Sequence, residues 1–289
     1  MHGRAPESGP YPSVIGEAPT RQRSDGRVRL QVGPAEPGGG TRIIDLAEAG
    51  PSRLRFPRGR GALEAVLVNT AGGVACGDHF AIDLDLAPGA DLVLTTTAAE
   101  KIYRSDGPVS RIENRVCLGE GARLAWLPQE TILFDRVRVW RRFEADLAPG
   151  AALVAAEIVA FGRAARGERI ADGLFADTWR VRRAGRLVYA DTFALEGPIS
   201  ELLERPAIGG GARACATLLD VSDGAEARLE EARATLAEAG IRGVEAAASA
   251  WNGHLVVRAL SDAVGPLRGL VAQFLAGYRG LPMPRVWQS

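Results

Sequence analysis

The sequence contains little of what disulfide-stabilised or zinc-binding proteins require. Its 289 residues include only three cysteines, Cys76, Cys117 and Cys215. They are odd in number, lie far apart and form no Cys-x-x-Cys pair. A disulfide framework and a zinc cluster are therefore both disfavoured.

Net charge and long apolar segments are also lacking. The 35 basic residues equal the 35 acidic ones, so no overall electrostatic field attracts nucleic acid or an anionic membrane. No apolar run approaches the roughly 20 residues that span a bilayer. Residues 1–26 are rich in Pro, Gly, Ser and Arg and lack the apolar core of a signal peptide. We therefore expect a disordered leader, a cytoplasmic protein, and neither nucleic-acid nor membrane partners.

A seven-residue frame, Leu-x-x-Gly-Ala-x-Leu, occurs three times, at 86–92, 118–124 and 147–153. Each copy places a tight turn between two segments of alternating apolar residues, which is typical of strand, turn and strand. One unit cannot bury its own apolar face, whereas stacked copies can. The sequence thus predicts a mainly β fold, with a layered, β-helical or solenoid-like body over residues 27–205.

Other segments of the body also read as strands. The alternating Arg27–Val32 predicts an edge strand, and the more continuously apolar Leu63–Asn69 predicts a buried one. Trp179–Arg183 and Arg186–Phe193 predict a hairpin that turns at Ala184–Gly185.

The pattern changes near residue 206, where helical spacing appears. Ala214–Leu219 reads as a strand, Ala225–Ala239 as a helix, and Val264–Tyr278 as a second helix. Between the helices, Asn252-Gly253 separates two strand-like segments, which is a strong hairpin signal. Residues 206–289 therefore predict a small α+β module packed on the β body.

Two acidic residues stand out in the body. Asp78 follows a glycine-rich loop at the start of a repeat strand, where it projects a carboxylate or caps a turn. Glu157 is alone in an apolar segment and lies on either a solvated face or a buried one. If Glu157 is buried, it needs a partner such as Arg163 or a cation, because an unpaired buried charge is too costly.

Three stretches together carry a resemblance to a known family: Ala71–Asp78, Lys101–Ser105 and Trp126–Glu130. Further matches are Glu157–Arg163, Gly167-Glu168 and Pro284–Trp287. As an ordered set, which extends from about residue 27 to the C-terminus, they make the chain resemble the urease accessory protein UreD family, also called UreH.

The resemblance implies a mostly β fold with no enzymatic activity and no tightly bound cofactor. Such proteins bind the urease apoprotein and a helical accessory partner, UreF, which recruits the nickel-carrying GTPase UreG. Nickel(II) is then in transit through an internal channel toward the urease active site. The expected function is urease maturation, as a scaffold and metallochaperone for nickel insertion.

The resemblance also suggests site residues. Asp78, Glu157 and Asp191 match acidic or channel-lining positions of the family, and His79 and Cys76 are added because they adjoin Asp78. Nickel(II) accepts carboxylate, imidazole and thiolate ligands, and scattered ligands suit passage better than storage. The predicted partner-binding residues are Lys101, Tyr103, Arg104, Arg285 and Trp287.

Two positions depart from the family pattern. Cys76 stands where most relatives have glycine, and Glu100 stands where a small or hydroxylated residue is common. Each either adds a metal ligand near the channel or reflects drift.

A different class of function remains open, because β-solenoids also include carbohydrate-active lyases and hydrolases. Hydrolysis needs paired carboxylates about 5 to 9.5 Å apart, and sugar binding usually needs an aromatic platform. The aromatic content of only 6% disfavours this reading. A third option is an interaction scaffold with no metal in its path.

Overall fold

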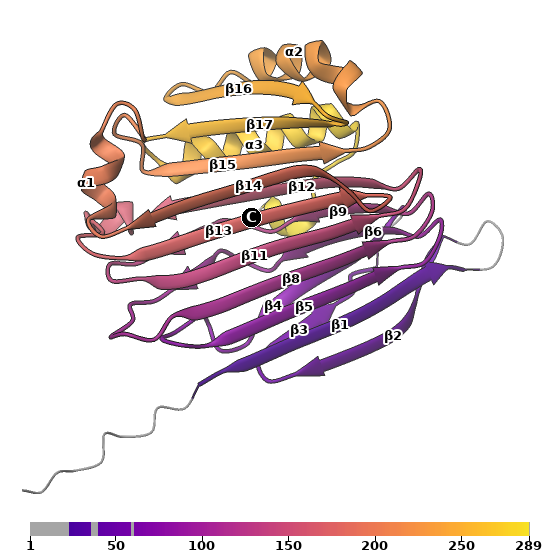
Figure 1. Cartoon of the computed structure of the whole chain (residues 1–289), viewed down its shortest axis with the longest axis horizontal. Helices are drawn as coiled ribbons and strands as arrows, with labels where there is room; N and C mark the ends of the chain where they lie inside the picture. The colour runs from indigo at the N-terminus through magenta and orange to yellow at the C-terminus, as the bar shows by residue number, and fades with distance from the viewer. Residues whose placement is uncertain (1–22, 36–39, 59–60, 289) are drawn as a thin grey trace, which may run out of the picture.

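A computed structural model describes residues 23–35, 40–58 and 61–288. Residues 1–22 of the expected leader lie outside this range, and the first strand begins at Asp25. The described chain forms two facing β-sheets, with helices gathered near the C-terminal strands (Figure 1). None of the described helices is both long and apolar enough to cross a bilayer.

The first sheet, as far as the structure describes it, has seven strands in the order β14-β13-β11-β8-β5-β1-β2. The five central strands are parallel to one another, and β2 and β14 pair antiparallel at the two edges. The strands are β1 (Asp25–Pro34), β2 (Thr41–Ala49), β5 (His79–Leu86), β8 (Ser110–Leu118), β11 (Arg138–Leu147), β13 (Leu174–Arg183) and β14 (Arg186–Glu196).

The second sheet contains the order β16-β17-β15-β12-β9-β6-β4-β3. Strands β4, β6, β9 and β12 are parallel to one another, and the short β10 pairs with both β12 and β7. The strands are β3 (Ser52–Arg55), β4 (Leu63–Asn69), β6 (Asp91–Thr96), β7 (Glu100–Ile102), β9 (Arg123–Leu127), β10 (Thr131–Leu133), β12 (Ala152–Phe161), β15 (Ala214–Val221), β16 (Val244–Trp251) and β17 (His254–Ser261).

The strand predicted at Arg27–Val32 exists as part of β1, but its predicted edge position is wrong. It lies between β5 and β2, because residues 41–49 form a further strand that pairs along its whole length. The polar and apolar residues of β2 alternate too weakly for this strand to stand out in the sequence.

The three sequence repeats are the arches that carry the chain from the first sheet to the second. They connect β5 to β6, β8 to β9 and β11 to β12. In each arch a glycine has a positive φ between 64° and 73°, which favours glycine at that position. Parallel pairing stacks equivalent leucines in register, and all are at most 3% exposed: Leu86, Leu118 and Leu147 on one side, Leu92, Leu124 and Leu153 on the other.

Stacking of these arches produces a solenoid of about four turns, which confirms the predicted β-helical body. Each turn buries its leucines against the turns above and below, so the apolar frame repeats because the packing environment repeats.

The C-terminal strands extend the second sheet of the solenoid, because β15 pairs antiparallel with β12. Helix α3 (Val264–Arg279) and helix α2 (Leu229–Ala239), preceded by the 3₁₀ turn η2 (Ala225–Arg228), lie beside β15, β16 and β17 (Figure 1). Asn252 and Gly253 have φ of 52° and 83° and connect β16 to β17. The predicted hairpin and helices are thereby confirmed. The remaining helical segments are η1 (Ala164–Arg166), α1 (Ile199–Glu204) and η3 (Arg285–Trp287).

Candidate functional site

Charged side chains interrupt the apolar interior between the two sheets. On β11, Arg141 occupies the inward face between the buried Val139 and Phe143. Asp177 takes the equivalent place on β13, directly beside Arg141 in the sheet. Glu157 projects from β12 of the opposite sheet. The alternation that points apolar neighbours inward therefore points these three charges inward as well.

The three charged residues form one buried cluster. Arg141 Nη1 lies 2.7 Å from Glu157 Oε2, and Arg141 Nη2 lies 2.6 Å from Asp177 Oδ2. The side chains of Arg141, Glu157 and Asp177 are 6%, 7% and 10% exposed, respectively. Arg141 also donates a hydrogen bond to the Thr131 hydroxyl at 3.0 Å. We call Arg141, Glu157 and Asp177 the buried triad.

Glu157 is thus buried, and its partner differs from the one suggested by the sequence. It pairs with Arg141, whereas Arg163 pairs with Glu168 at 2.7 Å. The indole of Trp126 also donates to Glu157 at 3.4 Å. Local sequence pointed to Arg163 only because of its proximity along the chain.

Burial determines the protonation of the triad. It raises the pKa of Glu157 to about 7, while the nearby Arg141 charge opposes the shift. Burial alone would lower the pKa of Arg141, but the charges of Asp177 and Glu157 outweigh it and raise that pKa. Arg141 therefore stays charged, and burial favours the neutral form of Glu157 while Arg141 favours its ionised form.

The triad leaves one acceptor unused. Asp177 Oδ2 accepts hydrogen bonds from Arg141 and from the Trp179 indole. Asp177 Oδ1 is also buried, yet it has no hydrogen-bond partner among the described residues. An unused buried carboxylate oxygen is costly, which makes it a candidate ligand atom.

A cavity of about 220 Å³ lies on one side of the triad. All three triad residues line it, together with Cys215 and Thr217 of β15. Asp191 and Arg258 also line it and pair at 2.8 Å, with side chains that reach solvent. This cavity therefore extends from the buried triad toward the surface at Asp191.

A smaller cavity of about 70 Å³ also has Arg141 and Glu157 in its wall. Asn69, Glu100 and Gln129 supply further polar groups. Burial raises the pKa of Glu100 to about 7, and hydrogen bonds from Asn69 oppose this shift. The two cavities share Arg141 and Glu157 in their walls, and we call the row of polar groups from Glu100 through the triad to Asp191 the interior passage.

The structure brings together only part of the predicted nickel set. Glu157 and Asp191 line the same cavity. Among the residues that the structure places around the two cavities, none is Cys76, Asp78 or His79. No group of three His, Cys, Asp or Glu side chains is arranged to hold a metal within the described part of the chain.

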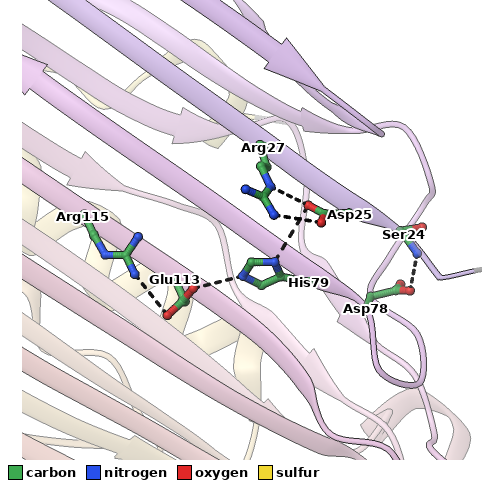
Figure 2. Close-up of polar contacts among 7 residues, drawn as sticks. All are labelled: Ser24, Asp25, Arg27, Asp78, His79, Glu113 and Arg115. Carbon is green, nitrogen blue, oxygen red and sulfur yellow. Dashed lines mark hydrogen bonds and ion pairs between the residues drawn. The ribbon is translucent and has the colours of Figure 1, made fainter.

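Cys76, Asp78 and His79 have separate environments. The Asp78 carboxylate accepts the backbone N–H groups of Ala75 and Ser24, each at 2.8 Å, and so caps the turn. His79 lies 3.0 Å from Glu113 and 3.9 Å from Asp25, and Figure 2 shows its ring between these two carboxylates. The Cys76 thiol donates to Asp106 at 2.9 Å. Adjacency in sequence therefore does not produce a shared site.

The predicted partner-binding residues also differ in exposure. Lys101, Arg104 and Arg285 are exposed. The Tyr103 hydroxyl donates to the Gly72 carbonyl at 2.9 Å. Trp287 is only 4% exposed, and its indole donates to the Thr95 hydroxyl and the Leu127 carbonyl at 3.1 Å each.

The buried Trp287 anchors the C-terminal segment beside the interior passage. Gln129, which lines the smaller cavity, donates to the Val286 carbonyl at 3.0 Å. Arg268 lies over the Trp287 ring at 5.1 Å and donates to its carbonyl. The C-terminal segment thereby supports one wall of the passage.

Sequence reasoning missed Arg141 and Asp177, although a signal was present. In Val139-x-Arg141-x-Phe143 and Phe175-x-Asp177-x-Trp179, a charge occupies the phase that is otherwise apolar. The same test singled out Glu157. Applied to the alternating segments 139–143 and 175–179, the test identifies Arg141 and Asp177 as well.

Comparisons with known proteins agree with the observed fold. Residues 24–288 match the family model of the UreD urease accessory protein. Over 289 residues, which cover all of both chains, the protein is 81% identical to urease accessory protein UreD 1 of Methylobacterium radiotolerans. It is 63% identical to UreD 2 of Methylorubrum populi, over 94% of this chain and 92% of that relative.

A third relative, UreD 3 of Methylorubrum extorquens, is 60% identical over 97% of this chain and 95% of its own length. These relatives are named as accessory proteins, so the chain is not an enzyme and the carbohydrate-active alternative is wrong. The resemblance carried by the sequence motifs is confirmed: the chain belongs to the UreD urease accessory protein family.

Proposed function

We propose that this protein delivers nickel(II) to urease along its interior passage. Family membership supports a role in urease maturation and an association with urease-related proteins. The protein acts as a cytoplasmic scaffold that binds the urease apoprotein and UreF, and through UreF the nickel-carrying GTPase UreG. Nickel is the cargo of this assembly, and no cofactor is held tightly.

The observation that carries the proposal is the polar row inside a solenoid. Burying a charge costs several kcal/mol even when it is paired, and an apolar layer would stabilise the fold at least as well. Four carboxylates nevertheless line the two cavities: Glu100, Glu157, Asp177 and Asp191. A passage for a cation accounts for them.

The chemistry of the lining favours transit over storage. Nickel(II) accepts carboxylate oxygens, but it binds most firmly where several imidazole or thiolate ligands converge. No such convergence exists in the part of the chain that the structure describes. Single carboxylates along a path can accept the ion and release it again.

The direct test replaces Glu157 with Gln and measures the nickel content of co-expressed urease. Glu157→Gln keeps the shape and resembles the protonated carboxyl, so the protein should fold and assemble normally. Urease from these cells should contain several-fold less nickel per assembled complex.

Glu144→Gln is the matched control, because Glu144 lies on the outward face of β11 and outside both cavities. This variant should leave urease nickel unchanged. Normal nickel in the Glu157→Gln complex, at normal complex yield, would contradict passage through the interior.

A further inference from the structure

Arg141 and Glu157 are the two residues that line both cavities. The larger cavity also has Asp177 and Asp191 in its wall, and the smaller cavity has Glu100. The guanidinium contacts a carboxylate from each of the two sheets, Asp177 from the first and Glu157 from the second. A cation that moves from Glu100 to Asp191 through both cavities therefore passes Arg141 and Glu157, the two residues that line both.

The neighbouring groups suit a divalent cation better than a guanidinium. Two carboxylates face a single positive charge, so one negative charge is uncompensated when Glu157 is ionised. Asp177 Oδ1 has no hydrogen-bond partner among the described residues, and Asp177 is 8% exposed. Arg141 thus leaves unused an acceptor that a metal ion could take.

The other lining groups keep this position weak for metals. Cys215 is the one thiol among the residues around the larger cavity, so several soft ligands do not converge there. Thr217 offers only a neutral hydroxyl. The other ligand atoms are oxygens, which bind nickel less firmly than converging imidazole or thiolate ligands do.

We propose that Arg141 is a gate in the interior passage: its guanidinium occupies a cation site between Glu157 and Asp177, and nickel crosses only by displacing it. This inference rests on the proposed function, since it names the residue that controls the same passage. Both cations cannot occupy the site together, because their like charges repel strongly at low dielectric. The larger cavity gives the displaced guanidinium room to move.

The gate predicts that removing Arg141 exposes a metal site hidden in the native protein. The test measures nickel binding by the full-length chain in equilibrium dialysis against nickel chloride, without urease or partners. Arg141→Met removes the charge and keeps most of the volume. This variant should bind one nickel ion at least tenfold more tightly than the native protein does, and its melting temperature should rise with nickel more than with magnesium.

Two further variants identify the ligands. Arg142→Met alters the next residue of β11, which is exposed and lies outside the triad, and should bind nickel as the native protein does. A triple variant, Arg141→Met with Glu157→Gln and Asp177→Asn, should lose the gain because it lacks both carboxylates. A folded Arg141→Met chain that binds nickel no better than the native one would overturn the proposal.

Removing one partner of a buried ion cluster is often strongly destabilising, so Arg141→Met can fail to fold without metal. Folding that is restored by nickel chloride would then support the gate. Arg141→Lys is the second variant, because an ammonium cannot bridge two carboxylates as a guanidinium does. It should bind nickel at least threefold more tightly than the native protein, and equal binding by folded Arg141→Lys would refute the gate.

If both variants stay unfolded with and without nickel, Arg141 is a structural ion pair and the proposal fails. Failure of the proposed function has a different signature. In that case the Arg141 variants would gain nickel affinity in dialysis, while Glu157→Gln would leave urease nickel unchanged.

Discussion

The two ends of strand β11 differ in chemistry. Near the arch, β11 presents Ala145 and Leu147 to an interior of stacked apolar residues. Toward the other end, the same face presents Arg141 to two carboxylates. The arch end repeats from turn to turn, whereas the triad occurs once. Stability is therefore concentrated in the repeated end, which leaves the other end free to hold groups that a core normally excludes.

The difference lies in how burial acts on each end. Each stacked leucine contributes about 1.5 to 3 kcal/mol by leaving water. The triad contributes little to the stability of the fold, because the cost of desolvating its charges offsets their attraction. A sheet that is well anchored at the arches can tolerate such a cluster several residues away.

The largest expected effect comes from weakening the arch end. Leu124 lies in register between Leu92 and Leu153 and is buried. Leu124→Ala should lower the free energy of unfolding by about 3 to 5 kcal/mol through lost burial and a residual cavity, as measured by urea denaturation. Leu187→Ala, at a side chain that is 43% exposed, should change it by less than about 0.5 kcal/mol. Equal losses of unfolding free energy in both variants would contradict the conclusion that the stacked leucines supply more stability than exposed side chains do.

Glu100, in the wall of the smaller cavity, should make the folded protein less stable as pH rises. An ordinary paired carboxylate has the opposite effect. Because the pKa of Glu100 is raised from 4.5 to about 7, the folded state favours its neutral form. Below pH 4.5 the group is protonated in both states and costs nothing. As pH rises from 4.5 to 7, the folded state acquires a penalty that reaches about 3 kcal/mol and then stays constant at higher pH.

Glu100→Gln should therefore stabilise the protein at pH 8 by about 1 to 3 kcal/mol and have little effect at pH 4. Thermal unfolding at the two pH values measures this difference. Equal effects at both values would show that Glu100 is not buried as the structure places it.

The smallest effect is expected at Asp78, which lies outside both cavities. Its two carboxylate oxygens accept two backbone N–H groups, and Asn has only one acceptor oxygen. Asp78→Asn should therefore cost about 1 kcal/mol, measured by urea denaturation. The turn-capping role leads us to expect normal nickel per assembled urease complex. Reduced nickel at normal assembly would instead support the role in nickel transfer suggested by the family resemblance, which stays a prediction.

Local patterns in the sequence predicted the repeats, the hairpins and the C-terminal helices, because each depends on residues close together in the chain. The leucine frame and the turn glycines determine the arches directly. The triad could not be assembled in this way. Arg141 and Asp177 are 36 residues apart and meet only because β11 and β13 are neighbours in the sheet.

The predicted nickel residues do not all line one cavity, for a related reason. Cys76, Asp78 and His79 were grouped because they are adjacent, but a loop followed by an alternating strand sends adjacent side chains in different directions. Asp191 and Glu157 line the same cavity because β14 pairs with β13 and because both sheets contribute to the cavity wall. Strand order, which one sequence does not reveal, decides such sites.

The buried triad also bears on how the chain finds its correct coil order. The three arches are so alike that a strand could pair with the wrong turn and still bury its leucines. If β13 paired with β8 instead of β11, Asp177 would lie beside Ile112 rather than Arg141. An unpartnered carboxylate would then be buried at a cost of several kcal/mol. A single set of charges thus distinguishes the native stacking from arrangements that the repeated apolar frame cannot tell apart.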